Sequence, residues 1–339
     1  MTAEFNPLDE IQVVACLQST LENEFSAPIS FRHAPMRITA ATSAWVWFIE
    51  LEGENLPIEM QGLTVLRISE PKEKALLDRQ VSLSKSLITQ GFPVPQSYWH
   101  GEIEGYPAEI QQRLSGRQAI DLLGTKKARK ALQGLATLQA SLHSLKTQNF
   151  NVPHLSAIKF LNEDLALRQA RVSAKDHSGT WEWLNQTAFT VPNNDDEPPV
   201  LCHGDFHPLN ALITETGEIG IVDWTDACLG DRHHDVGRTI ATYWFGALVA
   251  ETKIQRIALR FLRPWMRSTH RRSYEKSASL KLNENRLNWW QIAHLYRFWL
   301  LLAELADGRV TSRESSTLTG LPDDLMDQII RRCVKLQKI

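Results

Sequence analysis

The spacing of apolar residues along the first part of the chain alternates between helical and strand-like patterns. After Asn6-Pro7, apolar residues recur three or four positions apart at Ile11, Val14, Leu17 and Leu21. This spacing predicts an amphipathic helix, because such residues share one helical face, and Asn-Pro is a suitable start. A second helix is expected over residues 72–89. It ends where glycine and two prolines, between Gly91 and Pro95, cannot continue a helix.

Runs rich in β-branched and aromatic residues lie between and after these helices. Four of them predict antiparallel strands, at residues 44–51, 63–68, 96–101 and 107–114. From residue 116 the pattern becomes mainly helical, with helices expected at 125–142, 289–305 and 323–336. We therefore expect an α+β protein whose small β-rich N-terminal lobe, residues 1–114, precedes a larger helical lobe, residues 115–339.

Composition narrows the class of protein. The formal net charge of -2 over 339 residues argues against a strongly basic nucleic-acid binder. No apolar run reaches the length of a membrane span, and Met1–Asn6 lacks the regions of a signal peptide. Four scattered cysteines show neither metal-ligand spacing nor a disulfide framework: Cys16, Cys202, Cys228 and Cys333. We expect a reduced, cytoplasmic protein without membrane or nucleic-acid partners, acting as a monomer or weak homodimer.

The chemistry-bearing residues concentrate between residues 200 and 238. Asp205 and Asn210 lie five residues apart in a turn-rich loop. Two strand-like runs, 211–214 and 219–222, then form a predicted hairpin that would return Asp223 to a place beside Asn210. This set offers one carboxylate to handle a hydroxyl proton, and an amide oxygen with a second carboxylate to hold Mg²⁺, which prefers oxygen ligands.

The order of these residues resembles the signature of the aminoglycoside phosphotransferase and choline kinase-like superfamily. The matching elements are His203-Gly204-Asp205, Asn210, Val222-Asp223-Trp224, Gly230-Asp231 and Asp235. The resemblance implies a protein-kinase-like bilobal fold and ATP-dependent transfer of a phosphoryl group with Mg²⁺. The acceptor would be the hydroxyl of a small molecule such as an aminoglycoside-like compound, an amino alcohol or a sugar.

The resemblance also implies a role for each matching residue. Asp205 would be the catalytic base, and Asn210 and Asp223 the Mg²⁺ ligands. His203 would position the loop, and Asp235 would tie down its backbone. Aspartates in such a loop otherwise act as turn or helix caps, and we expect this structural role for Asp226 and Asp231.

In the N-terminal half, Val65-Leu66-Arg67 resembles the strand whose basic residue meets the nucleotide phosphates; the alternative is a surface arginine at a strand end. Gln80 stands where the family offers a glutamate to that basic residue, and an amide gives a hydrogen bond without a charge pair. Gln112, Arg113 and Leu114 resemble the segment whose backbone meets adenine. Residues 39–44 would cover the phosphates, yet they contain no glycine, which kinase-type loops use for close backbone approach.

Other functions remain open at this point. A nucleotide-binding pseudokinase is favoured by Gln80 and the glycine-free loop, whereas the intact Asp205, Asn210 and Asp223 argue against it. A two-metal hydrolase could use His203, His207, His233 and His234 with Asp205, Asp223 and Asp231. The remaining ligand blocks of that class are missing, and we expect His233 and His234 to be surface or capping residues.

Aromatic residues in the C-terminal half bear on the acceptor. Trp289, Trp290, Tyr296 and Trp299, together with the run 243–245, could cage an ammonium group or stack on a sugar. Their helical spacing favours core packing instead. Several arginines weigh against a polycationic antibiotic as acceptor: Arg263, Arg267, Arg271, Arg272 and Arg286.

Overall fold

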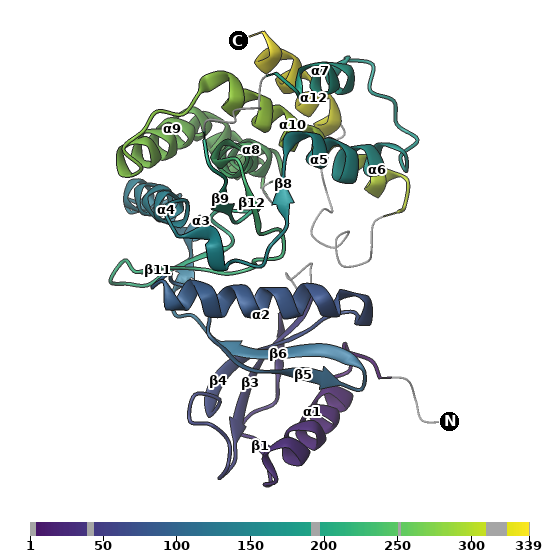
Figure 1. Ribbon diagram of the computed structural model, residues 1–339, viewed down its shortest axis with the longest axis vertical. Coiled ribbons are helices and arrows are strands. Elements are labelled where there is room, and N and C mark those ends of the chain that lie inside the picture. The colour runs from purple at the N-terminus through teal and green to yellow at the C-terminus, as the bar shows by residue number, and fades with distance from the viewer. Residues whose placement is uncertain (1–4, 39–43, 191–196, 250–251, 310–323, 339) are drawn as a thin grey trace. The chain divides into compact units, whose positions relative to one another are not determined.

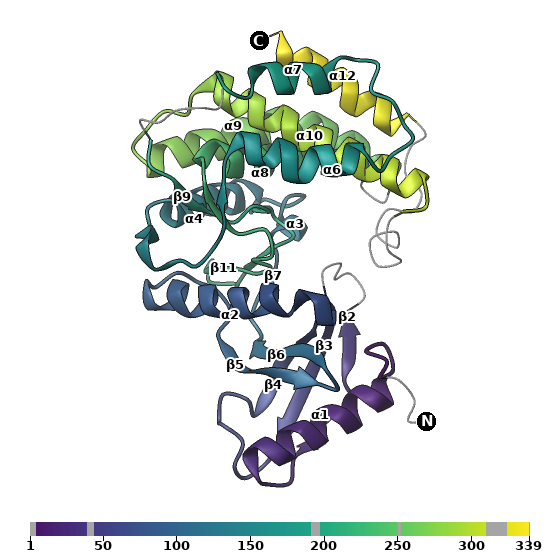
Figure 2. The same ribbon diagram turned by 45° about the vertical axis from the view of Figure 1, so that its right-hand side comes forward.

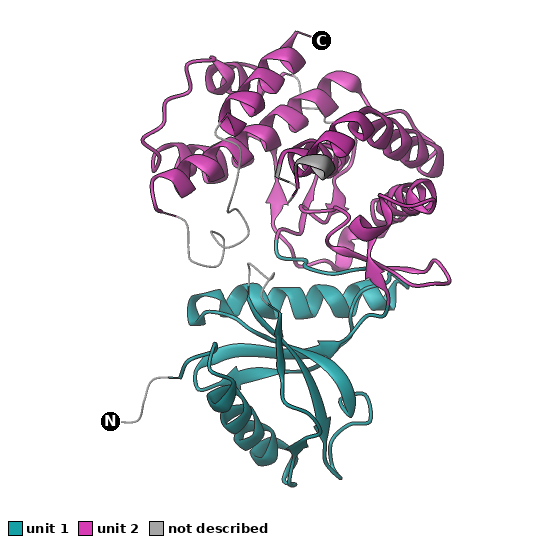
Figure 3. Ribbon diagram, turned by 180° about the vertical axis from the view of Figure 1, so that it is seen from behind, with its two compact units in different colours: residues 1–115, 220–225 teal, residues 116–219, 226–339 magenta. Residues whose placement is uncertain are grey.

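The computed structural model describes residues 5–38, 44–190, 197–249, 252–309 and 324–338 (Figure 1). It divides into two compact units (Figure 3). Unit 1 comprises residues 1–115 and 220–225, and unit 2 comprises residues 116–219 and 226–339. The short segment 220–225 joins unit 1 although it lies far along the chain. The predicted lobes, residues 1–114 and 115–339, assign this segment to the second lobe, and their boundary stays a prediction.

Unit 1 is built on a six-stranded sheet in which the neighbouring strands run antiparallel. Its strands are β1 Ser30–Phe31, β2 Met36–Ile38, β3 Trp45–Glu52, β4 Gly62–Ile68, β5 Ser97–Ile103 and β6 Tyr106–Gln112. The order is β1-β3-β4-β6-β5, with β2 paired to β3. Arg67 on β4 lies opposite Glu109 on β6 in the antiparallel register. The predicted strands are thus present, and their ends differ by one to a few residues.

The first helix, α1 (Glu10–Phe25), packs its apolar side against one face of this sheet. Asp9 caps it, because its side chain accepts hydrogen bonds from Ile11 N and Gln12 N. The buried residues are Val13, Leu17 and Leu21. The predicted start and face are partly wrong: Ile11 is 81% exposed, since the helix begins three residues beyond Asn6-Pro7 and turns its Val13 side to the sheet.

The second helix, α2 (Lys74–Thr89), follows a single 3-10 turn at Pro71–Glu73 and contacts β5 and β6. Its buried residues are Leu77, Gln80, Val81, Leu83 and Leu87. The predicted helix, residues 72–89, is thus confirmed, with its start two residues later than expected. The burial of Gln80 places a polar side chain inside unit 1, so its hydrogen bonds matter for the site.

Unit 2 combines short strands with long helices. Its strands are β7 Arg117–Gln118, β8 His154–Leu155, β9 Val200–Cys202, β10 Ala211–Ile213, β11 Ile219–Ile221 and β12 Cys228–Gly230. Its helices are α3 Ala119–Leu122, α4 Ala128–Leu142, α5 Ala157–Phe160, α6 Ala166–Gln169, α7 Thr180–Thr187, α8 Arg232–Val249, α9 Lys253–Ser277, α10 Glu284–Ala306 and α12 Leu325–Gln337. A 3-10 turn (Thr147–Asn149) and a π-helical turn (Leu161–Leu165) connect some of them. The strands form two three-stranded sheets, β11-β10-β7 and β8-β12-β9, and the chain crosses from unit 2 to unit 1 inside β11.

Helix α10 forms the centre of unit 2 and packs against both α8 and α12 (Figure 2). Trp289, Trp290, Tyr296 and Trp299 on this helix are all buried in one core cluster. These aromatic residues therefore belong to the core, as their spacing favours, and do not form an exposed cage. Within the described part of the chain, no helix combines the length and apolar character that a bilayer span requires.

Candidate active site

The loop that carries Asp205 begins directly after the buried strand β9 and is shaped by a glycine. Gly204 has φ +80, and a Cβ built on it would lie 2.2 Å from the backbone oxygen of Asp226. A larger residue has no space there, and the left-handed backbone is itself costly for any residue with a side chain. Gly204 therefore permits the sharp turn that follows His203.

Buried side chains hold the backbone of this loop in place. The Oδ1 atom of Asp235 accepts a hydrogen bond from Gly204 N at 2.8 Å, and its Oδ2 atom accepts one from Gln139 Nε2 at 2.8 Å. The Nδ1 atom of His203 accepts one from Asp205 N at 3.2 Å. Burial acts to raise the pKa of Asp235, but its hydrogen bond and attraction to His143 outweigh this and hold the pKa below its usual range. The carboxylate is thus ionised and fixes one backbone amide of the loop.

The carboxylate of Asp205 is restrained at both oxygens. Arg238 donates to Oδ1 through Nε at 2.9 Å and through Nη2 at 2.8 Å, while His207 Nε2 lies 3.2 Å from Oδ2. The guanidinium of Arg238 also lies over the ring of Phe298, 4.5 Å from its centroid. Burial acts to raise the pKa of Asp205, yet the charge of Arg238, followed by His207, holds it well below the usual range.

Arg238 was not among the predicted site residues, and His207 was named only for the hydrolase alternative. A signal for Arg238 is present in the sequence, because it follows Asp235 by three residues on α8 and so shares a helical face with it. His207 lies two residues from Asp205 in the same loop, which gives it reach but does not by itself indicate contact.

Asn210 closes the loop from its other end. Its Nδ2 atom donates to the backbone oxygen of Asp205 at 3.1 Å, and its own N donates to His207 O at 3.0 Å. The side-chain oxygen of Asn210 accepts no hydrogen bond from the described residues. An amide oxygen in this state suits a hard cation such as Mg²⁺.

A chain of hydrogen bonds links Arg67 to Asp223 within unit 1. Arg67 Nη1 donates to Gln80 Oε1 at 2.9 Å, and Gln80 Nε2 donates to Thr225 Oγ1 at 3.2 Å. Thr225 Oγ1 in turn donates to Asp223 Oδ1 at 2.6 Å. Because the Thr225 proton is committed to Asp223, the side chain at position 80 must accept from an arginine and donate to a hydroxyl at once. A glutamine does both, whereas an ionised glutamate only accepts.

The same residues line a small cavity in unit 1. Arg67, Gln80 and Asp223 face it together with Glu109, which is 3% exposed. Glu109 was not among the predicted site residues, although it lines this cavity. The available signal is a charged residue between the apolar residues Ala108 and Ile110 of the predicted strand 107–114, where burial of a carboxylate is costly.

The three residues of the predicted adenine-facing segment, 112–114, differ in their contacts. The backbone N of Gln112 already donates to Gln96 O at 2.7 Å, and the side chain of Gln112 is exposed. Arg113 lies over the ring of Phe48, 4.6 Å from its centroid, and Leu114 packs against the backbone at Gly220. Of the predicted phosphate-covering loop, residues 39–43 lie outside the described residues.

The histidines that suggested a hydrolase have other partners. His233 and His234 are buried, so the expectation of surface residues is wrong. Glu197, Asp231 and His233 do come within metal-binding distance of one another. However, Arg286 lies 2.9 Å from Asp231 and 3.6 Å from Glu197, and Arg232 lies 3.1 Å from Glu197. The two carboxylates are therefore neutralised by arginines, which speaks against a metal at this cluster.

Comparison with known proteins places this geometry in a family. Residues 58–268 match the model of the phosphotransferase enzyme family. Human acyl-CoA dehydrogenase family member 11 is 24% identical over an alignment 189 residues long, which covers 50% of this chain and 23% of that protein. This chain therefore spans less than a quarter of the length of the curated relatives it matches.

Solved structures share the fold at low sequence identity. The aminoglycoside phosphotransferase APH(3'')-Id of Streptomyces rimosus, in complex with ADP and streptomycin, is 15% identical with a TM-score of 0.58, covering 85% of this chain and 99% of that one. A choline/ethanolamine kinase family protein of Mesorhizobium loti is 12% identical with a TM-score of 0.60, covering 98% and 96%. The predicted α+β, protein-kinase-like fold is thus confirmed. Because the family model matches more than half of its residues, the chain belongs to the phosphotransferase enzyme family.

Proposed function

We propose that this protein is an ATP-dependent kinase that transfers the γ-phosphoryl group to a hydroxyl of a small molecule. The observation that carries the proposal is the state of Asp205. Its carboxylate is ionised and held at both oxygens, by Arg238 and His207, in a loop anchored to Asp235. A fixed, charged acceptor at the position of the family's catalytic base is what orientation of an attacking hydroxyl requires.

In the proposed reaction, Asp205 orients the acceptor hydroxyl and takes its proton during in-line transfer. Phosphoryl transfer passes through a loose transition state, so the attacking oxygen needs little deprotonation beforehand, and a weakly basic carboxylate is sufficient. Positioning and electrostatic stabilisation supply most of the rate. His203 and Asp235 support the loop.

The nucleotide and its metal would be held by the remaining predicted residues. Arg67, aligned by Gln80, offsets phosphate charge. Asn210 and Asp223 offer the oxygen atoms that would hold Mg²⁺, and the ion would neutralise the phosphates. The backbone of residues 112–114 would meet the adenine. ADP bound in the Streptomyces rimosus relative supports this choice of nucleotide.

The pseudokinase remains the second candidate. Gln80 and the glycine-free loop favour it. However, Gln80 connects Arg67 to Thr225 and Asp223 by hydrogen bonds, so a glutamine at this position is compatible with an active site. We favour transfer activity for that reason. The acceptor class stays broad, covering aminoglycoside-like compounds, amino alcohols and sugars. A cytoplasmic monomer or weak homodimer remains our expectation.

The test is a coupled ADP-release screen of the purified chain against amino alcohols, sugars and aminoglycosides. Asp205→Asn is the blank, and we expect it to abolish turnover while nucleotide binding persists. Asp226→Asn is the matched control, because Asp226 pairs with Arg297 at 3.4 Å and has no proposed role in transfer. Retained turnover in Asp205→Asn would sink the assignment. Nucleotide binding without turnover on any acceptor would support the pseudokinase.

A further inference from the structure

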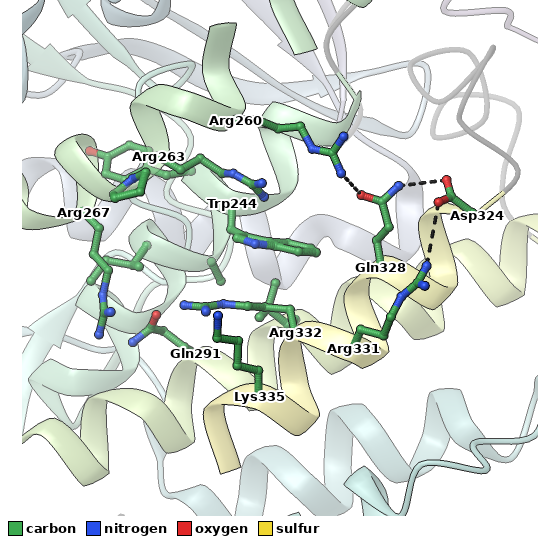
Figure 4. Close-up of a pocket in the computed structure, with 15 residues that line it drawn as sticks. Trp244, Arg260, Arg263, Arg267, Gln291, Asp324, Gln328, Arg331, Arg332 and Lys335 are labelled. Carbon is green, nitrogen blue, oxygen red and sulfur yellow. Dashed lines mark hydrogen bonds and ion pairs between the residues drawn. The ribbon is translucent and has the colours of Figure 1, made fainter. Parts of the chain in front are cut away.

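A second cavity, of about 690 Å³, lies in unit 2 among α8, α9, α10 and α12 (Figure 4). None of the predicted nucleotide, metal or catalytic residues lines it. Six cationic side chains do: Arg260, Arg263, Arg267, Arg331, Arg332 and Lys335. The acidic residue among its lining is Asp324. Such an imbalance is unusual for a cavity that serves only packing.

The described residues compensate only part of this charge. Arg267 lies 2.7 Å from Glu284, and Arg331 lies 3.8 Å from Asp324. Arg260 donates to the neutral amide of Gln328 at 2.8 Å, as Figure 4 shows. The other three cations, Arg263, Arg332 and Lys335, form no ion pair with the described residues. In addition, Nη1 of Arg263 is buried and has no hydrogen-bond partner in the part of the chain that the structure describes.

The crowding of cations has an electrostatic cost. Burial, followed by the charges of Arg260 and Arg332, lowers the pKa of Arg263 to about 10. Burial and the charge of Arg267 also lower the pKa of Arg332. Like charges that are partly removed from water repel one another strongly. An anion bound among them would relieve that repulsion and complete the missing hydrogen bond.

The cavity also has an aromatic and apolar wall. The guanidinium of Arg263 lies 5.1 Å from the centroid of the Trp244 ring. Tyr243, Pro264 and Leu295 line the same space. A ligand that fits both parts carries a compact negative group at one end and an apolar or aromatic portion at the other.

We propose that this cavity binds an organic phosphate ester. The phosphate would be held by Arg263, Arg332 and Lys335, and the organic portion would lie against Trp244. A phosphate dianion matches several converging cations better than a carboxylate, since it has more charge and three acceptor oxygens, and guanidinium groups bind it in a forked geometry. This site is additional to the proposed transfer reaction and does not depend on it.

The test is calorimetric titration of the full chain with phenyl phosphate, inorganic phosphate and malonate at equal ionic strength. We expect phenyl phosphate to bind at least tenfold more tightly than inorganic phosphate, and malonate to bind weakest. The double variant Arg263→Gln/Arg332→Gln should weaken phenyl phosphate binding at least tenfold. Arg272→Gln is the matched control, because Arg272 is exposed on α9 and does not line the cavity; it should leave affinity unchanged.

Each alternative outcome contradicts part of the proposal. Equal affinity in the double variant and the wild type would place the phosphate elsewhere and overturn the site. If malonate bound as tightly as the two phosphates, the assignment of a phosphate ligand would be overturned. Equal affinities for inorganic phosphate and phenyl phosphate would contradict a contact between the organic portion and Trp244. If the double variant does not fold, Lys335→Gln carries the same test with an expected loss of several-fold.

Discussion

At the level of single residues, the charge and orientation of the Asp205 carboxylate depend on neighbouring residues that are not part of the sequence motif. Arg238 and His207 approach opposite oxygens of its carboxylate. The side chain of Asp205 is 26% exposed, and these contacts hold its pKa low against the effect of burial. The same contacts restrict the rotation of the side chain, so charge and orientation are set together.

Replacing Arg238 by glutamine should therefore change the pH dependence of the reaction. Without the cation, burial dominates and the pKa of Asp205 rises. The ionised form is then lost at a higher pH, so the acidic limb of the kcat/KM profile should move upward, with a fall of about 10- to 100-fold at neutral pH. The measurement is kcat/KM against pH on the best acceptor of the screen. An unchanged acidic limb would contradict the role of Arg238.

The hydroxyl of Thr225 offers a second residue-scale prediction. Thr225→Val removes the proton that Asp223 accepts and the oxygen to which Gln80 donates. Since Asp223 is a proposed Mg²⁺ ligand, the Mg²⁺ concentration for half-maximal turnover should rise about tenfold, in line with the effect of losing a group that orients a metal ligand. Thr225→Ser keeps the hydroxyl and should stay close to the wild type. Equal Mg²⁺ dependence of both variants would show that the hydroxyl does not matter.

At the scale of helices, close packing around α10 determines how α8 presents its N-terminal turn. Asp235 and Arg238 lie near the start of α8, and Gly237 lies between them. A Cβ built on Gly237 would come within 2.9 Å of the Trp290 Cβ on α10. Trp290 also donates from Nε1 to Asp231 Oδ2 at 2.9 Å, just before α8 begins. The close approach of α8 and α10 therefore depends on the absence of a side chain at Gly237.

Substitutions at two glycines of α8 allow the effect of close packing on stability to be measured apart from the effect of helix propensity. Gly237→Ala should destabilise the protein by about 1–3 kcal/mol, because the methyl group overpacks against α10. Gly246→Ala should stabilise it by roughly 0.5–1 kcal/mol through helix propensity alone, because no other described part of the chain lies within 4 Å of the new Cβ. Urea unfolding followed by circular dichroism measures both. A stabilising Gly237→Ala would mean that the helices can separate at little cost.

At the scale of the whole molecule, the proposed nucleotide, metal and catalytic residues belong to different compact units. Arg67, Gln80 and Asp223 belong to unit 1, whereas Asp205 and Asn210 belong to unit 2. A ligand that binds the folded chain stabilises it according to its concentration and affinity. Nucleotide binding should therefore be visible in the thermal stability of the chain.

Mg-ADP at one hundred times its Kd should stabilise the protein by about 2.7 kcal/mol and raise Tm by several degrees. EDTA should reduce this shift, and Asp223→Ala should reduce it further, because both remove metal bound with the nucleotide. Asp205→Asn should keep the shift, since Asp205 is proposed to act on the acceptor. Differential scanning calorimetry provides the measurement. A Tm shift that EDTA leaves unchanged would argue against a metal at Asp223.

The sequence by itself determined the features that depend on local spacing. Alternating and helical periodicities predicted β3, β4 and α2 within a few residues. The motif from His203 to Asp235 predicted the family because its residues lie close together in the chain. Each of these signals is contained in a short window, where steric preference and periodicity act directly.

Only the tertiary structure decided the features that join distant segments. The burial of His233 and His234, the contact of Arg238 with Asp205, and the position of Glu109 opposite Arg67 all arise from packing between elements. The basic cavity is the clearest case, since its cations come from α9 and α12, whose positive charges look like ordinary surface residues in the sequence. Burial and charge compensation depend on which helices meet, and a linear pattern does not specify that.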